Sequence, residues 1–478
     1  MKNDYLIQKK PLSALVLFSV PIIIGNLFQQ FYTMADSAIV GRFVSEQALA
    51  AVGASYALTN IFICVAIGGG IGASVIVSRY FGAKEYENMK SAVFTALLSF
   101  LAVSIVLGGI GLLLGRQIMV VLNTPADVLD LSVQYLNIYF LGLPFLFMYN
   151  VLSAMFNALG KSRIPLYFLI FSSVFNVILD VVFVTQFGMG VAGVAWATLI
   201  AQGISAVLSF FVFLKELRKM CGQEQTNEHG QDEKPCRKAK YNGKIFDKEE
   251  MWAMMRVAVP SIFQQSTVSI GMMLVQSVVN SFGSEALAGF SAAMRIESIC
   301  VVPMAGIGNA VSSYTAQNLG AGKQERVVEG YHAANRMVIA CAVLIAVVLE
   351  TAHRPIITLF LGGGGTETAL ATGVGYLKFM GWFFCLIGFK MAVDGLLRGA
   401  GDMKMFTIAN LVNLSVRVIV AVTMAPRFGI AMVWIAVPIG WFLNWAISFM
   451  EYRTGKWRKT MEQKEEKKFE CGEERNGK

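Results

Sequence analysis

The stretch of sequence that decides the fold is LSALVLFSVPIIIGNLFQQFYTMA, residues 12–35, which contains no charged side chain. A helix needs about 20 consecutive apolar residues to cross the ~30 Å hydrocarbon core of a bilayer. The stretch lacks the alternation of apolar and polar residues that a strand of an outer-membrane barrel would show. Backbone groups in lipid must be satisfied within their own segment, so the sequence predicts a membrane-spanning helix here.

Eleven further apolar runs follow the first one. The twelve predicted spans cover residues 12–35, 49–77, 92–114, 131–159, 165–186, 191–214, 254–281, 286–315, 333–358, 370–397, 405–426 and 430–450. The composition agrees, because only 15% of the residues are charged, whereas a soluble domain has about 25%. We therefore predict an all-α membrane protein, which argues against a soluble enzyme, a nucleic-acid-binding module or a disulfide scaffold.

Lys and Arg predict how the chain crosses the membrane, because they gather in cytoplasmic loops. Most of the 40 basic residues fall on one side, including those of the amino end, the loop after residue 77, the 215–253 stretch and the carboxyl tail. The opposite loops hold little beyond Arg42, Arg116, Arg354 and Arg427. We expect a multi-pass protein of the cell inner (plasma) membrane with both termini in the cytoplasm. The net charge of +9 then needs no nucleic-acid partner.

The first span shows no small-residue cleavage site before Asp36. Signal peptides are short and end at such a site. We expect the first span to be retained as a helix.

An internal repeat divides the chain into two halves. Short matches recur in order at offsets of 238 to 241 residues: Val20-Pro21 with Val259-Pro260, 43–50 with 282–288, 81–83 with 319–321, Tyr135 with Tyr376, 158–160 with 399–401, and 187–188 with 428–429. Six ordered matches indicate duplication. Each half has six spans, an even number, so both halves enter the membrane the same way up. The sequence predicts two six-helix bundles related by a pseudo-two-fold axis along the membrane normal.

The repeat and the polar stretches together give the domain organisation. We predict an amino-terminal six-helix lobe (1–214), a cytoplasmic linker (215–253), a carboxyl-terminal six-helix lobe (254–452) and a cytoplasmic tail (453–478). Substrate sites in such transporters lie between the repeats near mid-membrane. We expect the protein to function as a monomer within the bilayer.

Acidic residues within apolar runs are the first functional candidates, because a charge at mid-bilayer is costly and rarely retained without a role. Asp36 lies on one helical face with Gln29 and Thr33. The alternative is a solvated position at the helix end near Arg42.

A second group of polar residues lies in the fifth and sixth spans. Asn176 and Asp180 are four residues apart, which places them on one helical face, and Thr198 could join them. If Asp180 and Asp36 are brought together in a low-dielectric site, the two carboxylates cannot both stay ionised cheaply. One then takes a proton, or a cation settles between them. The pattern predicts a proton or sodium site, and the alternative is a hydrogen-bonded structural cluster between helices.

The second half offers less distinct candidates. Glu297 could attract a cationic substrate into a central cavity. Asp394 lies four residues from both Lys390 and Arg398, so it can instead be neutralised within its own helix. Further candidates for lining the cavity are the glutamines Gln29, Gln30, Gln264 and Gln265.

Motifs for catalysis and nucleotide binding are missing from the sequence, which has no GxxxxGK[ST] phosphate loop, no GxSxG elbow and only three His. We predict that the protein is not an enzyme and needs no cofactor. Uphill transport would then depend on an ion gradient.

The twelve spans in two halves, the stretch from Pro21 to Asp36, and the turns at Leu159-Gly160-Lys161 and 398–402 (Arg-Gly-Ala-Gly-Asp) resemble the multidrug and toxic compound extrusion (MATE) family. The resemblance covers about residues 10–450. It implies export of cationic drugs and dyes in exchange for inward protons or sodium.

The resemblance also assigns roles to particular residues. It implies that Asp36, Tyr135, Asn176, Asp180 and Thr198 form an ion-coupling site, with sodium as a possible ligand of Asp36, Asn176 and Asp180. Some members have a second sodium site with an acid in the seventh span, but residues 257–281 here contain no Asp or Glu. This difference favours coupling through the amino-terminal lobe.

These inferences predict a secondary multidrug efflux transporter that exchanges small cationic or amphipathic organic compounds for protons or sodium by alternating access. A lipid-linked oligosaccharide flippase of related architecture is the alternative. Its cavity would need several cationic side chains, for which Arg295, Lys390 and Arg417 are candidates. A channel or a non-transporting receptor is the third possibility.

Overall fold

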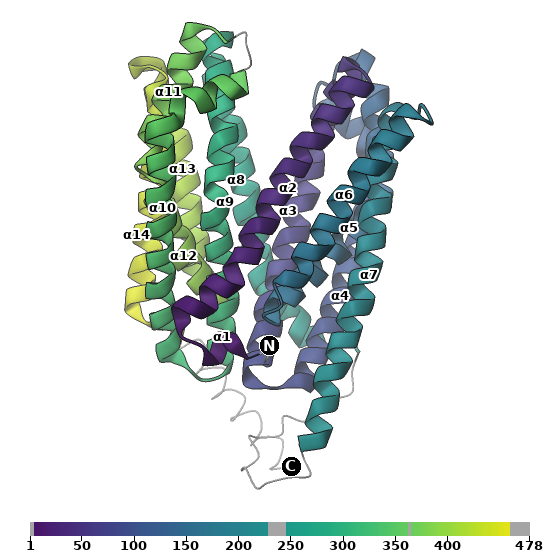
Figure 1. The fold of residues 1–478 in the computed structure, drawn as a ribbon, viewed down its shortest axis with the longest axis vertical. Coiled ribbons are helices and arrows are strands. Elements are labelled where there is room, and N and C mark those ends of the chain that lie inside the picture. Colours follow the sequence, from purple (N-terminus) through teal and green to yellow (C-terminus); the bar gives the residue numbers. More distant parts are fainter. Residues whose placement is uncertain (1–3, 228–244, 362–364, 459–478) are drawn as a thin grey trace. The chain divides into compact units, whose positions relative to one another are not determined.

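The computed structural model describes residues 4–227, 245–361 and 365–458, and within these ranges every regular element is a helix (Figure 1). The helices of the first half are α1 (Tyr5–Gln8), α2 (Pro11–Phe43), α3 (Glu46–Ala83), α4 (Tyr86–Val121), α5 (Ala126–Ala158), α6 (Arg163–Thr185) and α7 (Gly190–Asn227). Those of the second half are α8 (Lys248–Asn280), α9 (Ser284–Gly320), α10 (Gln324–Leu361), α11 (Glu367–Gly381), α12 (Phe384–Ala400), α13 (Met403–Phe428) and α14 (Ala431–Thr454).

The helices confirm the predicted all-α fold with twelve spans. Among the described residues, 11 helices are long and apolar enough to cross a membrane by themselves, and the pair α11 and α12 supplies one more. This last span was predicted as a single run, 370–397, but its two parts meet at an angle of 54°. Gly381 ends α11 immediately before the bend, and glycine has a low helix propensity.

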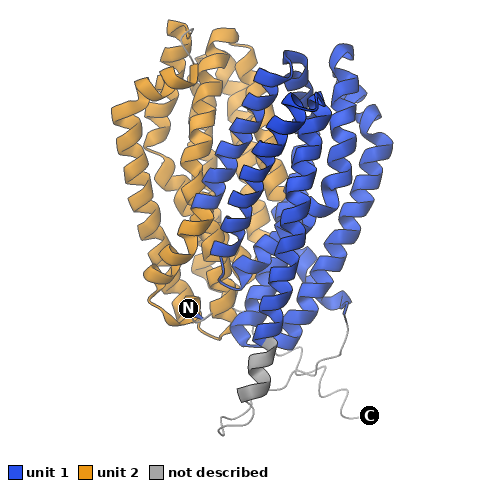
Figure 2. Ribbon diagram, turned by 45° about the vertical axis from the view of Figure 1, so that its right-hand side comes forward, with its two compact units in different colours: residues 1–4, 24–262 blue, residues 5–23, 263–478 orange. Residues whose placement is uncertain are grey.

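The chain folds into two compact units, shown in different colours in Figure 2. Unit 1 comprises 1–4 and 24–262, and unit 2 comprises 5–23 and 263–478. Each unit holds most of one half of the sequence, with two exceptions. The first part of α2, up to residue 23, belongs to unit 2, and the first part of α8, up to residue 262, belongs to unit 1. Both changes of unit come two residues after a proline, Pro21 or Pro260. A proline inside a helix removes one backbone hydrogen bond there.

Polar contacts hold the segment that contains Leu6 and Lys9 in unit 2. Asn318 donates to the Leu6 carbonyl (3.3 Å), and the Arg326 guanidinium donates to the carbonyls of Leu6 (3.3 Å) and Lys9 (2.6 Å). Leu6 is fully buried. These bonds satisfy carbonyls near the start of α2, so the segment is fixed by its backbone as well as by apolar packing.

Close backbone packing holds the first part of α8 in unit 1. A Cβ at Gly68 of α3 would lie 2.6 Å from the Ile262 nitrogen, and one at Gly72 would lie 2.7 Å from the Met254 carbonyl oxygen. Only glycine allows this approach. The Gly-rich stretch 68–74 is therefore a packing surface for α8.

The two halves repeat the same helix pairs. In unit 1, α5 packs against α3, α4 and α7, and α6 packs against α7. In unit 2, α12 packs against α9, α10 and α14, and α13 packs against α14. Loop glycines repeat as well, because Gly188 (φ 62°) and Gly429 (φ 91°) both take backbone conformations that favour glycine. These correspondences extend the duplication from the sequence to the packing.

Two parts of the predicted linker are helical. Residues 215–227 continue α7, and 248–253 begin α8. Lys161 forms an ion pair with Glu216 in the first of these parts. The middle of the linker, 228–244, and most of the predicted tail, 459–478, lie outside the described residues.

Candidate ion-coupling site

Two acidic side chains from different helices meet within unit 1. The carboxyl groups of Asp36 on α2 and Asp180 on α6 lie close enough for a hydrogen bond between them. Asp180 is 0% exposed and Asp36 is half-buried. A carboxylate can only accept, so a direct bond between two carboxyl groups requires a proton on one of them. Two carboxyl groups this close in a low-dielectric site do not both stay ionised cheaply.

An amide on α6 joins this pair to neighbouring hydroxyl groups. Asn176, which is 2% exposed, lies within hydrogen-bond distance of Thr198 Oγ1 on α7 (3.3 Å). In the amide orientation that satisfies both of its ends, Asn176 Nδ2 donates to Asp180 Oδ2 (2.9 Å) and Tyr32 Oη (3.1 Å), and its oxygen accepts from Thr198. Three helices thus contribute to one polar cluster.

The acidic pair still has unused acceptors. Asp36 Oδ1 and Asp180 Oδ1 are buried and have no hydrogen-bond partner among the described residues. A buried acceptor without a partner costs free energy, which a proton or cation at this position would recover. Beside the pair, Tyr135 and Thr198 line a cavity of about 10 Å³, close to the volume that one water needs.

Apolar side chains close one side of the cluster. Val40 lies one turn after Asp36, and Val184 lies one turn after Asp180. Both belong to a buried apolar group, with Tyr135 packed against it. Apolar packing thus joins α2 and α6 one turn beyond the two carboxyl groups.

Gln29, Thr33 and Asp36 were predicted to share one helical face, but they do not all contribute to the acidic cluster. Gln29 and Thr33 are exposed, and Thr33 Oγ1 donates to the Gln29 carbonyl oxygen of its own helix (2.9 Å). Gln30 is half-buried. Of this face, Asp36 alone enters the described acidic cluster.

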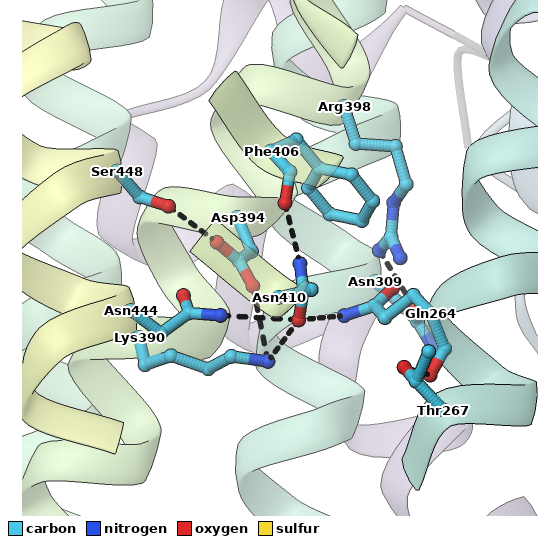
Figure 3. Close-up of polar contacts among 10 residues, drawn as sticks. All are labelled: Gln264, Thr267, Asn309, Lys390, Asp394, Arg398, Phe406, Asn410, Asn444 and Ser448. Atoms are coloured by element: carbon cyan, nitrogen blue, oxygen red, sulfur yellow. Dashed lines mark hydrogen bonds and ion pairs between the residues drawn. The ribbon is translucent and has the colours of Figure 1, made fainter. Parts of the chain in front are cut away.

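The second-half candidates belong to unit 2, where a buried polar network surrounds Asp394 (Figure 3). Lys390 Nζ forms an ion pair with Asp394 Oδ2 (3.0 Å), and both side chains are at most 5% exposed. Ser448 Oγ donates to the other carboxylate oxygen of Asp394 (2.9 Å), and Lys390 also donates to Asn410 Oδ1 (3.1 Å). Asp394 is thus neutralised within its own helix, the structural alternative that the sequence left open.

The rest of the network involves Arg398 and Gln264. The spacing of Arg398 also allowed a pair with Asp394, but its Nη2 donates to Asn309 Oδ1 on α9 (2.8 Å), as Figure 3 shows. Gln264 Nε2 donates to Asn410 Oδ1 (3.4 Å), so this glutamine is part of the buried network. Gln265 is half-buried, and its carbonyl accepts from Ser269.

Glu297 has a separate partner in unit 2. It is 5% exposed and accepts a hydrogen bond from Tyr376 Oη. Tyr376 is fully buried and packs edge-on against Phe290, with ring centroids 5.5 Å apart. The tyrosine that repeats Tyr135 therefore serves here as a partner for a buried acid.

Comparison with known proteins places this architecture in a family. The family model MatE matches residues 21–182 and 260–423, one match in each half. The probable multidrug resistance protein YpnP of Bacillus subtilis (strain 168) is 30% identical over 459 residues, which are 96% of this chain and 98% of YpnP. The chain belongs to the MATE family.

Other comparisons agree with this assignment. The probable multidrug resistance protein NorM of Thermotoga maritima is 23% identical over 453 residues, 93% of each chain. A crystal structure of MATE in the bent conformation superposes with a TM-score of 0.84 at 22% identity, covering 96% of this chain and 99% of that one. The MATE fold has twelve helices in two lobes, and MATE proteins are transporters rather than enzymes.

Tyr32 is the member of the MATE acidic cluster that the sequence analysis missed. It lies four residues before Asp36, so it shares a helical face with that carboxyl group. Spacing could have identified it, but an aromatic residue in an apolar run is usually a packing residue. Its polar role becomes visible only when α6 brings Asn176 beside it.

Proposed function

We propose that this MATE protein exports small cationic or amphipathic organic compounds across the cell membrane in exchange for inward protons or sodium ions. The family supports multidrug efflux in general. The observation that carries the finer proposal is the contact between Asp36 and Asp180, each with a buried carboxylate oxygen that lacks a partner. Such a pair needs a positive charge and can release it when conditions change.

The proposed coupling acts through helix packing in unit 1. A proton or sodium ion that reaches the pair allows α2 and α6 to stay in contact at their two carboxyl groups. When the ion leaves, two negative charges face each other in a low-dielectric site and repel. Alternation between these packings is the two-state element that alternating access requires. If the ion is sodium, Thr198 can supply a further oxygen ligand, and Asn176 can supply one once its amide turns its oxygen toward Asp180.

The membrane potential alone is sufficient to drive useful export of an uncharged substrate, whereas one-for-one exchange with a monovalent cation depends on the concentration gradient of the coupling ion. One charge that moves down 100 mV provides ~2.3 kcal/mol. At about 1.4 kcal/mol for each tenfold step, this maintains a gradient of roughly 50-fold for a neutral substrate.

The test is transport of ethidium into everted membrane vesicles, with proton and sodium gradients imposed separately. We expect one of the two gradients to drive uptake by the parent protein. Asp36→Asn should abolish this uptake at unchanged protein level, because an amide takes up no proton at neutral pH and carries no negative charge to balance a sodium ion.

Asp127→Asn is the matched control. It removes the same charge from an exposed position in the first turn of α5 and should transport like the parent. Gradient-driven uptake by Asp36→Asn at the parental rate would refute the coupling role. Flux that does not saturate and needs no exchange would instead indicate a channel.

The alternative of an oligosaccharide flippase required several free cations along the substrate path. One of the three candidates, Lys390, is committed to Asp394 and Asn410 in the buried network. We therefore retain drug export as the proposed function.

A further inference from the structure

A cavity of about 270 Å³ in unit 2 has no role in the proposed coupling. Its volume approaches the ~300 Å³ at which small-molecule sites begin. Met272, Phe290 and Met294 form an apolar part, and Gln276, Arg295 and Arg417 form a polar part. No acidic residue in the described part of the chain lines it.

Arg417 is the unusual member of this lining. Its side chain comes from α13 and is only 8% exposed. Its Nε and Nη2 atoms are buried and have no hydrogen-bond partner among the described residues. A buried charged donor without a partner costs free energy. The Nε and Nη2 atoms lie along one edge of the planar guanidinium group, where they form the fork that binds a carboxylate or phosphate group through two parallel bonds.

The surrounding charges leave this fork available. Glu297 is near enough to attract Arg417 electrostatically, but no ion pair within 4.0 Å joins them in the described structure. Glu297 accepts its hydrogen bond from Tyr376. Arg295 adds a second positive charge at the cavity, so the two arginines outnumber the one nearby acid.

The duplication shows that this is the second-half version of the acidic site. The offset of 241 relates Gly160 to Gly401 and Gly188 to Gly429, on both sides of α6 and α13. The same offset places Arg417 at the position of Asn176 and Ala421 at the position of Asp180.

The helix that carries Asp36 has also lost its acid in the second half. The offset of 239, which relates both Pro21 to Pro260 and Phe43 to Phe282, places Asp36 on Val275, and Val275 lines the cavity beside Gln276. The second half therefore has Val275, Arg417 and Ala421 where the first half has Asp36, Asn176 and Asp180, so these positions have lost both carboxyl groups and gained a guanidinium group.

We propose that unit 2 binds an organic anion, a carboxylate or phosphate with an apolar body, with its charged group on Arg417 and its apolar part against Met272, Phe290 and Met294. This site goes beyond the proposed efflux and does not depend on the ion coupling. The anion can be a soluble compound or a lipid headgroup, since both present the same acceptor chemistry.

The test is equilibrium binding by calorimetry to the full-length protein in nanodiscs of zwitterionic lipid. The probes are naphthalene-2-carboxylate and the neutral naphthalene-2-carboxamide, which share one apolar body. We expect the carboxylate to bind at least about tenfold more tightly, because a charged hydrogen-bonded pair is stronger than a neutral one. Arg417→Gln should abolish this preference, and Arg417→Lys should retain part of it.

Arg427→Gln is the matched control, because it removes an arginine from the exposed end of the same helix and should bind like the parent. Asp36→Asn should also bind like the parent, which separates this proposal from the coupling mechanism. If Arg417→Gln does not fold, Arg295→Gln provides the same comparison at the second cation and should weaken the carboxylate selectively.

Nanodiscs that contain phosphatidylglycerol distinguish the two sources of the anion. Weaker carboxylate binding there, in the parent but not in Arg417→Gln, would identify a lipid headgroup as the ligand. Unchanged binding would identify a soluble anion. Equal affinity for the carboxylate and the carboxamide, or an Arg417→Gln variant that keeps the parental preference, would overturn the proposal.

Discussion

At the scale of single residues, Lys390 and Asp394 show what a buried charge requires. Their ion pair is almost fully removed from solvent, and Ser448 and Asn410 satisfy the remaining polar atoms. Removing one partner of such a pair leaves an uncompensated charge, whereas removing both leaves none. The pair therefore fixes the contact of α12 with α13 and α14 without necessarily adding to stability.

The first prediction follows from this asymmetry. Lys390→Met should lower the free energy of unfolding by about 3–5 kcal/mol, because the Asp394 carboxylate loses its cation in a low-dielectric site. Adding Asp394→Leu to the same chain should recover most of the loss. Unfolding in mixed micelles measures both changes.

A lysine on the neighbouring helix provides the control for this prediction. Lys378 is 4.0 Å from Glu350, and both side chains are 48% exposed. Lys378→Met should change the unfolding free energy by less than about 1 kcal/mol, since exposed pairs contribute little. A double variant as unstable as Lys390→Met alone would contradict the assignment of the pair.

Residue spacing predicted those contacts that lie within one helix. The four-residue spacing of Lys390 and Asp394 was visible in the sequence, and the structure confirms that they pair. The same spacing also suggested Arg398, which instead reaches α9. Spacing gives only the residues that can meet along one helix, and the choice between partners depends on which helix packs beside them.

Contacts between helices are less accessible to sequence reasoning. Nothing in the apolar runs shows that Asp36 of α2 faces Asp180 of α6. Their proximity was expected only from the family resemblance. The cavity beside Arg417 was not foreseen for the same reason, because α8, α9 and α13 all contribute to it.

At the scale of helices, the span made of α11 and α12 depends on close backbone contact with α9. A Cβ at Gly395 of α12 would lie 2.2 Å from the Gly308 carbonyl oxygen of α9, closer than real contacts allow. A Cβ at Gly375 of α11 would have no heavy atom within 4 Å. Two glycines of one bent span thus have opposite environments.

The second prediction compares these glycines. Gly395→Ala should lower the free energy of unfolding by about 1–3 kcal/mol, because α9 and α12 must move apart. Gly375→Ala should raise it by up to about 1 kcal/mol, because alanine has the higher helix propensity. Thermal unfolding in detergent provides the comparison. Equal effects of the two substitutions would show that the contact between α9 and α12 does not depend on the missing side chain.

At the scale of the whole molecule, one duplicated design carries opposite charges at related positions. Unit 1 has Asp36, Asn176 and Asp180 where unit 2 has Val275, Arg417 and Ala421, although the helix pairs around them repeat. The same fold accommodates the acidic residues of unit 1 and the arginine of unit 2 because apolar packing between the helices, which the repeat preserves, keeps the helices in place. The polar residues are then free to differ, so repeat positions predicted the helices better than they predicted the chemistry.

The last prediction concerns the direction in which this design crosses the membrane. Lys84, after α3, and Asn123, after α4, are exposed loop residues with nearly the same left-handed backbone (φ 59° and 56°), so cysteine at either position meets the same local strain. Basic residues near the loop that contains Lys84 predict that this loop is cytoplasmic. In a chain without other cysteines, a membrane-impermeant maleimide should label Asn123→Cys in intact cells and Lys84→Cys only after lysis. The reverse pattern would invert the topology and place both termini outside.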